Sequence, residues 1–285
     1  MTGILIVDKP EGWTSQDVTA KLRGVFHERR VGHGGTLDPM ATGVLPVFFG
    51  RATRAVPFFE NAEKEYLVGL RLGVVTDTQD ITGSVLSESE AELSEDTLRA
   101  ALQKMQGPQM QLPPMYSAIK IHGKKLYELA REGKDAERTP RPVELKELEL
   151  LSFDGKDALF RLLCSKGTYA RTVCHDLGQS LGCGACMNSL RRTQAGAYRI
   201  EKAFSMEQIL SGEAKVLPVD SLFTDLPACS LSEKEEVRCR HGNPIPREDL
   251  TPGRYRVYGP DGTFLMLAEE KSGELVTVKS FFEVE

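Results

Sequence analysis

The stretch HGGTLDPMATGVL, residues 33–45, carries a single carboxylate, Asp38, among glycines, prolines and apolar side chains. Asp38 precedes Pro39, and a residue before proline is pushed out of the helical region into an extended conformation. The glycines just upstream permit a close approach or a positive φ that a side chain would forbid. Asp, Gly and Pro all favour turns, so composition alone predicts a turn here. It leaves open why the chain places one isolated acid in it.

The whole chain has the size and composition of an ordinary globular protein. With 285 residues, 40% of them hydrophobic and 27% charged, it can bury the core of one large domain and a small one. The apolar run at 3–7 is followed at once by Asp8 and Lys9, so it is too short for a signal sequence or a membrane span. We expect a first strand there, in a cytoplasmic protein without membrane association.

The charges are unevenly distributed. The net charge is −5, which argues against a general nucleic-acid binder. However, residues 161–202 hold seven basic side chains against two acidic ones, and residues 116–146 hold eight against five. Two solvated faces would explain this pattern. It equally suits an electropositive surface on an acidic protein, able to bind a polyanion selectively.

Hydrophobic spacing predicts mixed helices and strands. Two helices are expected to start at a polar cap and to bury residues three or four positions apart. Their caps and apolar faces are Thr14 or Ser15 with Val18, Leu22 and Val25 or Phe26, and Ser94 with Leu98, Leu102 and Met105. A third helix is expected at about 168–181.

Alternating polarity predicts the strands. Tyr66, Val68, Leu70 and Leu72 alternate with positions that include Glu65 and Arg71, which puts Tyr66 on the apolar side of a strand. Further strands are expected at 44–49, 143–153, 158–164 and 193–200. Since no regular βαβ rhythm appears, we predict an α+β fold with a mixed, mostly antiparallel sheet.

Proline-marked segments suggest the domain organisation. We expect a catalytic domain at 1–227, containing a basic insertion at about 108–140 with a short helix at 124–132. Residues 228–285 are expected to form a small β-rich module. Asp261 and Gly262 are predicted to form a hairpin turn within it.

Two groups of residues resemble metal sites. Cys174, His175, Cys183 and Cys186 suggest zinc, but adjacent helical side chains point about 100° apart, and packed thiols are the better interpretation. Asp77 and Asp80 suggest a calcium loop but lack the remaining ligands of an EF-hand. We expect no metal site.

Six blocks of sequence, in order, resemble one enzyme family. They are DKPEGWTSQDV at 8–18, VGHGGTLDPMATGVLPVFFGRATR at 31–54, EKEYLVGLRLGVVTDTQDITG at 63–83, PPMYSAIKIHGKKLYELAREG at 113–133, CSKGTYARTVCHDLG at 164–178 and LRRTQAG at 190–196. Together they resemble the TruB family of bacterial tRNA pseudouridine synthases, which act on a uridine in the TΨC loop. The resemblance implies a catalytic domain of pseudouridine-synthase type, and 228–285 is similar to a PUA-like module.

The resemblance also implies a reaction. Pseudouridine synthases break the N1–C1′ bond of a uridine, here position 55 of tRNA, rotate the base and rejoin it through C5 without metal or cofactor. It assigns Asp38 as the nucleophile, with C1′ or C6 as the attacked atom. A lone buried carboxylate is costly unless it is paired. The matching Arg171 is the expected partner that keeps Asp38 ionised and oriented.

The remaining assignments concern RNA binding. The resemblance places Tyr66 as a stacking surface for the flipped base and Tyr169 and Leu190 beside the target nucleotide. His33 corresponds to a histidine that fills the space left by flipped bases. Basic residues of the insertion, mainly Lys120, Lys124 and Lys125, would contact phosphates. Lys9 and Pro10 are expected to be structural.

Three function classes follow from these residues. The first is a stand-alone enzyme acting on the T-arm of tRNA, and the second a relative that needs a guide RNA. The motif TDTQDITG and the small C-terminal module favour the first, without a guide RNA and as a monomer. The third is a tRNA-folding chaperone, which an Asp38→Asn protein that still folds tRNA would reveal.

Overall fold

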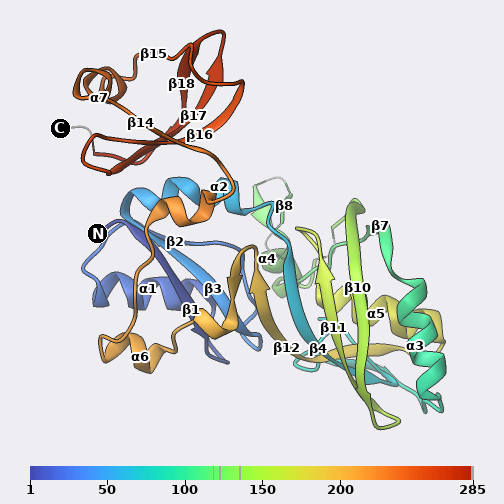
Figure 1. Cartoon of the computed structure of the whole chain (residues 1–285). Helices are drawn as coiled ribbons and strands as arrows, with labels where there is room; N and C mark the ends of the chain where they lie inside the picture. The colour runs from blue at the N-terminus through green and yellow to red at the C-terminus, as the bar shows by residue number, and fades with distance from the viewer. Residues whose placement is uncertain (118, 122, 135, 284–285) are drawn as a thin grey trace.

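The computed structural model describes residues 1–117, 119–121, 123–134 and 136–283. In this part of the chain, a nine-stranded sheet dominates the first 200 residues and a five-stranded sheet follows residue 227 (Figure 1). No helix in it is long and apolar enough to span a membrane. The arrangement is the predicted α+β fold, with a mixed, mostly antiparallel sheet and a β-rich C-terminal part.

The large sheet consists of two antiparallel halves joined by a parallel seam. Its order is β1 (Gly3–Lys9), β3 (Thr42–Phe49), β12 (Ala185–Ala195), β4 (Lys64–Leu72), β11 (Asp157–Cys164), β10 (Arg141–Phe153) and β7 (Gly107–Gln111). β2 (Val31–His33) pairs with β3, and β13 (Tyr198–Arg199) with β12. The seam between β3 and β12 consists of the register pairs Arg191↔Thr42 and Arg192↔Gly43.

The N-terminal half of the sheet is buried on both faces. Alternate residues of β1 face opposite sides, Leu5 and Val7 toward α1 (Ser15–Val25), Ile4 and Ile6 toward the core that includes α2 (Val56–Phe59). A strand covered on both faces needs a continuous apolar run rather than alternation. The run at 3–7 meets this need, as predicted.

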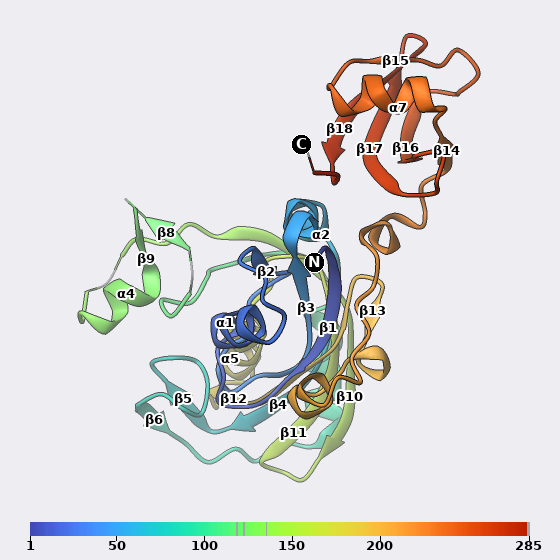
Figure 2. The same cartoon turned by 90° about the vertical axis from the view of Figure 1, so that its left-hand side faces the viewer.

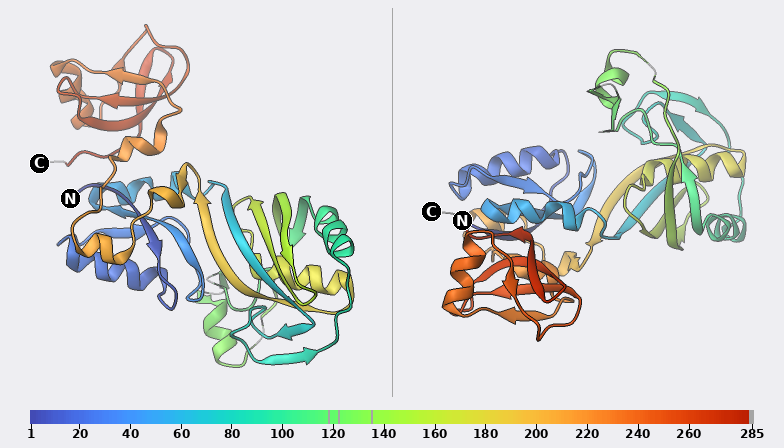
Figure 3. Two further views of the ribbon diagram at one scale, coloured as in Figure 1. Left: turned by 60° about the horizontal axis from the view of Figure 1, so that its bottom comes forward. Right: turned by 90° about the horizontal axis from the view of Figure 1, so that it is seen from above.

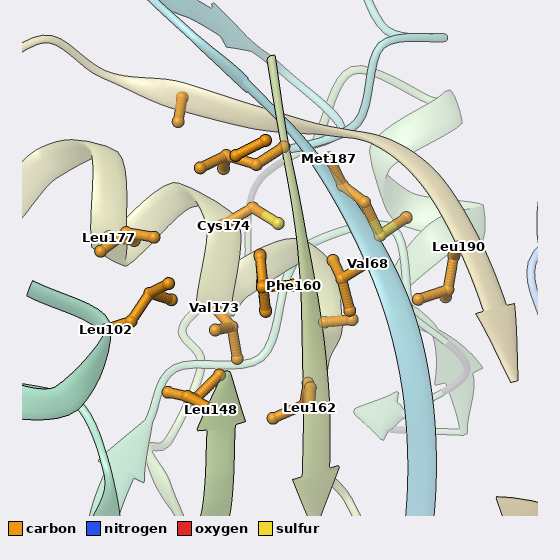
Figure 4. Close-up of a cluster of buried hydrophobic side chains, with 14 of the residues drawn as sticks. Val68, Leu102, Leu148, Phe160, Leu162, Val173, Cys174, Leu177, Met187 and Leu190 are labelled. Atoms are coloured by element: carbon orange, nitrogen blue, oxygen red, sulfur yellow. The ribbon is translucent and has the colours of Figure 1, made fainter. Parts of the chain in front are cut away.

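The other half buries one face. Helices α3 (Glu95–Lys104) and α5 (Ala170–Leu181) pack on it, so that Val68, Phe160 and Leu162 lie against Val173 and other helix residues (Figure 4). The opposite face carries ion pairs across strands, such as Arg161 with three glutamates. These are Glu65, Glu147 and Glu149.

The cap and strand predictions are confirmed with one exception. Thr14 caps α1 and Ser94 caps α3 through side-chain bonds to backbone N–H groups. The strand expected at 193–200 was wrong, because β12 runs from Ala185 to Ala195 and β13 is a separate short strand. Two adjacent arginines in β12 hide its strand character, and pairing with β3 and β4 on either side fixes its extent.

Two short hairpins branch from the large sheet. One is β5 (Val74–Thr76) with β6 (Val85–Glu88), and the other is β8 (Lys120–Ile121) with β9 (Lys124–Lys125), followed by α4 (Leu126–Arg131). Both project on the side of α5 (Figure 2). The insertion expected at 108–140 leaves the sheet later than predicted, because Gly107–Gln111 pairs with β10 as β7.

The C-terminal part is a five-stranded sheet with one helix. Its strands are β14 (Ala228–Ser230), β16 (Gly253–Tyr258), β17 (Phe264–Lys271), β18 (Glu274–Ser280) and β15 (Ile245–Pro246). The turn at Asp261 and Gly262 joins β16 to β17, as predicted. Helix α7 (Glu233–Arg240) was not predicted, since its sequence is almost entirely charged.

The C-terminal part lies beside the N-terminal half of the large sheet (Figure 3), and contacts between aromatic rings join the two. Phe223, at the end of the 3-10 helix η3 (Val219–Phe223), lies 5.6 Å from the Phe58 ring of α2. Its ring is also 6.3 Å from Phe264 and 6.1 Å from Phe281 in the C-terminal part. Helix α6 (Met206–Leu210) belongs to the segment that leads to this contact.

Candidate active site

Asp38 lies in the loop between β2 and β3 and opens a tight turn. The N–H of Ala41 donates to the Asp38 carbonyl over 3.0 Å, with Pro39 in the turn position that proline favours. The Ser15 hydroxyl at the start of α1 accepts from the N–H of Leu37 over 2.9 Å. The predicted turn is therefore present, and it is fixed against a helix terminus.

Lys9 forms hydrogen bonds to the same loop. Its side chain is fully buried, and Nζ donates to the carbonyls of Pro10, Trp13 and Pro39 at 2.8, 2.6 and 3.2 Å. Burial lowers the pKa of Lys9 to about 8, although the nearby Asp38 carboxylate opposes this shift. Lys9 therefore has a structural role, as expected, because it donates a hydrogen bond to the carbonyl of Pro39, the residue that follows Asp38.

The structure brings Asp38 and Arg171 together, as expected. Nε of Arg171, in the first turn of α5, lies 3.0 Å from Oδ2 of Asp38. The arginine side chain is 6% exposed and the aspartate side chain 35%. The guanidinium also donates to the carbonyls of Thr78 and Tyr116, at 3.2 and 2.9 Å. One side chain therefore joins the Asp38 loop to the segments that carry both hairpins.

Asp80 is a site residue that sequence reasoning missed. It is 5% exposed, and its Oδ2 lies 3.6 Å from Nη1 of Arg171. Its Oδ1 accepts from the hydroxyls of Thr78 and Thr82 and from the Thr82 N–H. The signal was present as Thr-x-Asp-x-Thr, a carboxylate between two hydroxyls that can satisfy it locally.

The site holds Asp38 at a perturbed pKa. Burial raises the pKa of Asp38 above its ordinary value, Arg171 opposes this effect, and the Asp80 charge adds to it. The arginine therefore orients the carboxylate without restoring the pKa of an exposed aspartate. Perturbed acids of this kind are common at catalytic sites.

Three further predicted residues lie near this pair. Tyr66 packs against the buried cluster that contains Leu37 and Leu190, next to the Asp38 loop. Burial raises the pKa of Tyr66, and its hydroxyl is close enough to feel the charges of Arg192 and Asp38. Tyr169 stands directly before α5, where Gln111 holds its backbone at both N–H and carbonyl. Burial raises the pKa of its hydroxyl as well.

The other predicted binding residues lie on β2 and on the β8–β9 hairpin. His33 ends β2, and burial with the Arg192 charge lowers its pKa, so the ring is neutral at pH 7. Its Nδ1 has no hydrogen-bond partner among the described residues. Lys124 is exposed, 3.6 Å from Glu132. The side chains of Lys120 and Lys125 fall outside the part of the structure that can be described.

The cysteines are free thiols in this structure. Cys174 and Cys186 are buried, and Cys174, on α5, belongs to the hydrophobic cluster that this helix forms with the sheet (Figure 4). Burial raises the pKa of both thiols above the ordinary value. In the described ranges no three His, Cys, Asp or Glu side chains gather in a way that could hold a metal ion.

Comparisons with known proteins agree with this geometry. The TruB family pseudouridylate synthase (N terminal domain) model matches residues 23–170, and the tRNA pseudouridylate synthase B C-terminal domain model matches 171–224. The tRNA pseudouridine synthase B of Syntrophomonas wolfei is 43% identical over 94% of this chain and 93% of its own. That of Francisella tularensis subsp. novicida is 40% identical over 99% and 95%.

Solved structures show the same fold. A Cbf5–Nop10–Gar1 complex matches with a TM-score of 0.74 at 24% identity, over 98% of this chain and 85% of that one. An H/ACA RNP bound to a substrate RNA containing 2′-deoxyuridine matches with the same TM-score, at 22% identity over 99% and 86%. With the curated relatives matched over nearly their full length, the chain belongs to the TruB family of pseudouridylate synthases.

Proposed function

We propose that this enzyme isomerises the uridine at position 55, in the TΨC loop of tRNA, and that Asp38 is its nucleophile. The observation that carries the proposal is the ion pair of Asp38 with the buried Arg171, in a loop fixed at Leu37 and Pro39. A carboxylate that attacks a sugar or base carbon must be ionised and aimed, and the pair supports both needs.

The chemistry needs no added reactant. Attack by the carboxylate at C1′ breaks the N1–C1′ bond, whereas attack at C6 forms an adduct in which that bond breaks next. The freed base turns, C5 bonds to C1′ and loses its proton, and N1 gains a proton. Product and substrate have the same atoms, so neither oxidant, reductant nor cofactor enters the balance. Asp38 is released when the new bond forms and is ready for another uridine.

Binding roles follow from position. A uridine inside a stem-loop must be flipped out, and stacking on Tyr66 offsets lost base stacking worth roughly 1 to 3 kcal/mol. Leu190 and Tyr169 would line the base pocket, and His33 would fill space left in the RNA. The hairpin of Lys120, Lys124 and Lys125 would contact phosphates.

Two parts of the chain would share the work. Residues 1–227 would form the catalytic domain, and 228–285 a PUA-like module that holds another part of the tRNA. We expect a cytoplasmic monomer that acts without a guide RNA, as the TruB relatives' names imply a tRNA substrate.

The test is Asp38→Asn with C5-tritiated uridine in a T-arm RNA and no guide or partner added. Asn keeps the size of the side chain, so RNA binding and the melting temperature should stay near wild type while tritium release stops. Asp154→Asn is the matched control, because Asp154 lies in the distant β10–β11 turn and its Oδ1 still accepts from two backbone N–H groups. Turnover of Asp38→Asn within tenfold of wild type would reject the nucleophile.

A further inference from the structure

Arg192 is a buried arginine at the seam of the large sheet. Its side chain is among the largest that are fully buried, at 1% exposure. On β12 it pairs with Gly43 of β3 on one side and with Tyr66 of β4 on the other. Figure 1 shows β12 passing between these two strands. Cross-strand partners place their side chains on the same face, so Arg192 and Tyr66 are neighbours.

The guanidinium of Arg192 bonds to the loop that leads to Asp38. Nη2 donates to the carbonyl of Gly35 over 3.1 Å, and Nε donates to the carbonyl of Val44 over 2.7 Å. Gly35 has a φ of +95°, a conformation that glycine adopts readily. A Cβ added there would lie 3.5 Å from Nη1 of Arg192, so the loop backbone rests directly on the guanidinium.

This charge is not neutralised by an acid. In the described part of the chain no carboxylate lies within 4 Å of Arg192, and the groups that face its guanidinium, the Gly35 and Val44 carbonyls and the Tyr66 hydroxyl, carry no charge. Lys64, also buried, lies close by and donates to the carbonyls of Glu60 and Ala62. Burying unpaired cations is unfavourable for stability. A residue kept under these conditions is better explained by a task in the site than by stability.

We propose that Arg192 is a positioning residue for the reaction, a proposal that rests on the function given above. It holds the Gly35 carbonyl, three residues before Asp38, and faces the hydroxyl of Tyr66. It thereby fixes the loop of the nucleophile relative to the ring on which the uracil stacks. Lys9 fixes the other end of the same loop at Pro39.

A lysine cannot reproduce this arrangement. A guanidinium presents separate donors in a rigid plane, whereas an ammonium is a single point on a flexible stem. Lysine would keep the charge but could not keep the Gly35 and Val44 carbonyls and the Tyr66 hydroxyl in one geometry. Attack on a carbon requires near-contact alignment, so loosening of the loop should slow chemistry more than binding.

The experiment compares Arg192→Lys and Arg192→Met with Arg191→Lys as the control. Arg191 is the adjacent arginine, but its side chain bonds to Asp8 and Thr42 instead. We expect both Arg192 variants to bind a T-arm stem-loop within about threefold of wild type. Their single-turnover rates at saturating RNA should fall at least tenfold, with Lys less affected than Met, while Arg191→Lys stays within about twofold.

Amide hydrogen exchange distinguishes a positioning role of Arg192 from a general contribution to stability, because only the first predicts faster exchange confined to the Asp38 loop. The N–H groups of Gly34 and Leu37 are bonded to Pro46 and Ser15, and they should exchange faster in both variants while those of β4 do not. An unchanged rate, or equal loosening of β4, overturns the proposal. If neither Arg192 variant folds, Tyr66→Phe is the deciding variant, because it removes the hydroxyl that faces Arg192. The proposal then requires faster amide exchange at Gly34 and Leu37 with an unchanged Tm. Unchanged exchange at these two residues overturns the proposal. Turnover by Asp38→Asn would reject Asp38 as the nucleophile, and absence of tritium release from the wild-type enzyme would reject the function itself, whatever Arg192 does.

Discussion

Nε of Arg171 lies 3.0 Å from Oδ2 of Asp38, and the two residues are 133 positions apart in the chain. The same guanidinium lies 3.6 Å from Asp80, so two carboxylates share one cation. The charges of Asp80 and Arg171 therefore both influence the pKa of Asp38, the first raising it and the second lowering it.

Asp80→Asn should move the acid limb of the reaction to lower pH. The pKa of Asp38 is raised, first by burial and further by the charge of Asp80. Removing that charge lowers the pKa, so Asp38 stays ionised in more acidic solution. Single-turnover rates measured from about pH 4.5 to 7.5 test this shift. Asp77→Asn, at an exposed neighbour that accepts from Ser84, is the control, and a limb that stays or moves up contradicts the prediction.

Lys64 should make stability rise with pH above about 8. Burial lowers its pKa from 10.5 to about 8 in the folded protein. Between these values the unfolded chain binds the extra proton, so the free energy of unfolding increases by up to about 1.4 kcal/mol per pH unit. Below pH 8 Lys64 is protonated in both the folded and the unfolded protein, so the folded state bears the full unfavourable free energy of burying the charge. Urea unfolding of wild type and Lys64→Met at several pH values measures the difference.

Lys146 serves as a comparison, because its contribution to stability should change with pH in the opposite direction. Glu63, whose Oε1 lies 2.5 Å from Nζ, raises the pKa of this exposed lysine. Its stabilising contribution is present at neutral pH and is lost as the pH rises past 10.5. The free energy of unfolding of wild type minus that of Lys146→Met should fall as the pH rises. If the same difference for Lys64→Met also falls with pH, Lys64 is not the desolvated group.

Lys124→Glu should weaken RNA binding in a salt-dependent way. The Lys124 side chain is 58% exposed on the projecting hairpin, with Glu132 as its neighbour. Loss of one phosphate contact lowers the slope of log Kd against log salt by about 0.7 to 0.9. Titrations from about 50 to 300 mM salt measure the slope. Lys104→Glu, at the end of α3, should leave it unchanged, and an unaltered slope in Lys124→Glu would exclude a phosphate contact.

Phe223→Ala should distinguish whole tRNA from an isolated T-arm. The Phe223 ring contacts Phe58 of α2 on one side and Phe264 and Phe281 of the C-terminal part on the other. We expect the C-terminal part to move more freely when the Phe223 ring is removed. We expect KM to rise several-fold for full-length tRNA and little for a stem-loop, with kcat unchanged for both. Phe26→Ala, which removes a ring packed on Phe49, is the control for lost stability. Equal effects on both RNAs would contradict the prediction.

Local chemistry made much of this fold predictable. Caps at Thr14 and Ser94 and the alternation around Tyr66 depend on neighbours in sequence, and the structure has them where expected. Helix α7 and strand β12 were not predictable in this way. α7 lacks an apolar face, and β12 is extended because β3 and β4 flank it, which no window of sequence contains.

The same division holds in the site. The isolation of Asp38 was visible in the sequence, but its partner Arg171 came only from the family resemblance. The contact of Asp80 with Arg171 and the bond from Lys9 to Pro39 depend on how distant segments meet. The Thr-x-Asp-x-Thr pattern signals only that the Asp80 carboxylate is satisfied locally. Long-range contacts of buried charges were the missing information.

The seam between β3 and β12 has a consequence for synthesis on the ribosome. Asp38 is made early, but the strand that completes the support of its loop comes about 150 residues later, as the pairing Arg192↔Gly43 shows. A nascent chain that ends before β12 contains Asp38, the proposed nucleophile, and Arg171, but it lacks Arg192 and the strand that pairs with β3 and β4. Domains form as units once their last element has emerged. We therefore expect no activity from a nascent chain until β12 has emerged and the second half of the sheet has closed on the first.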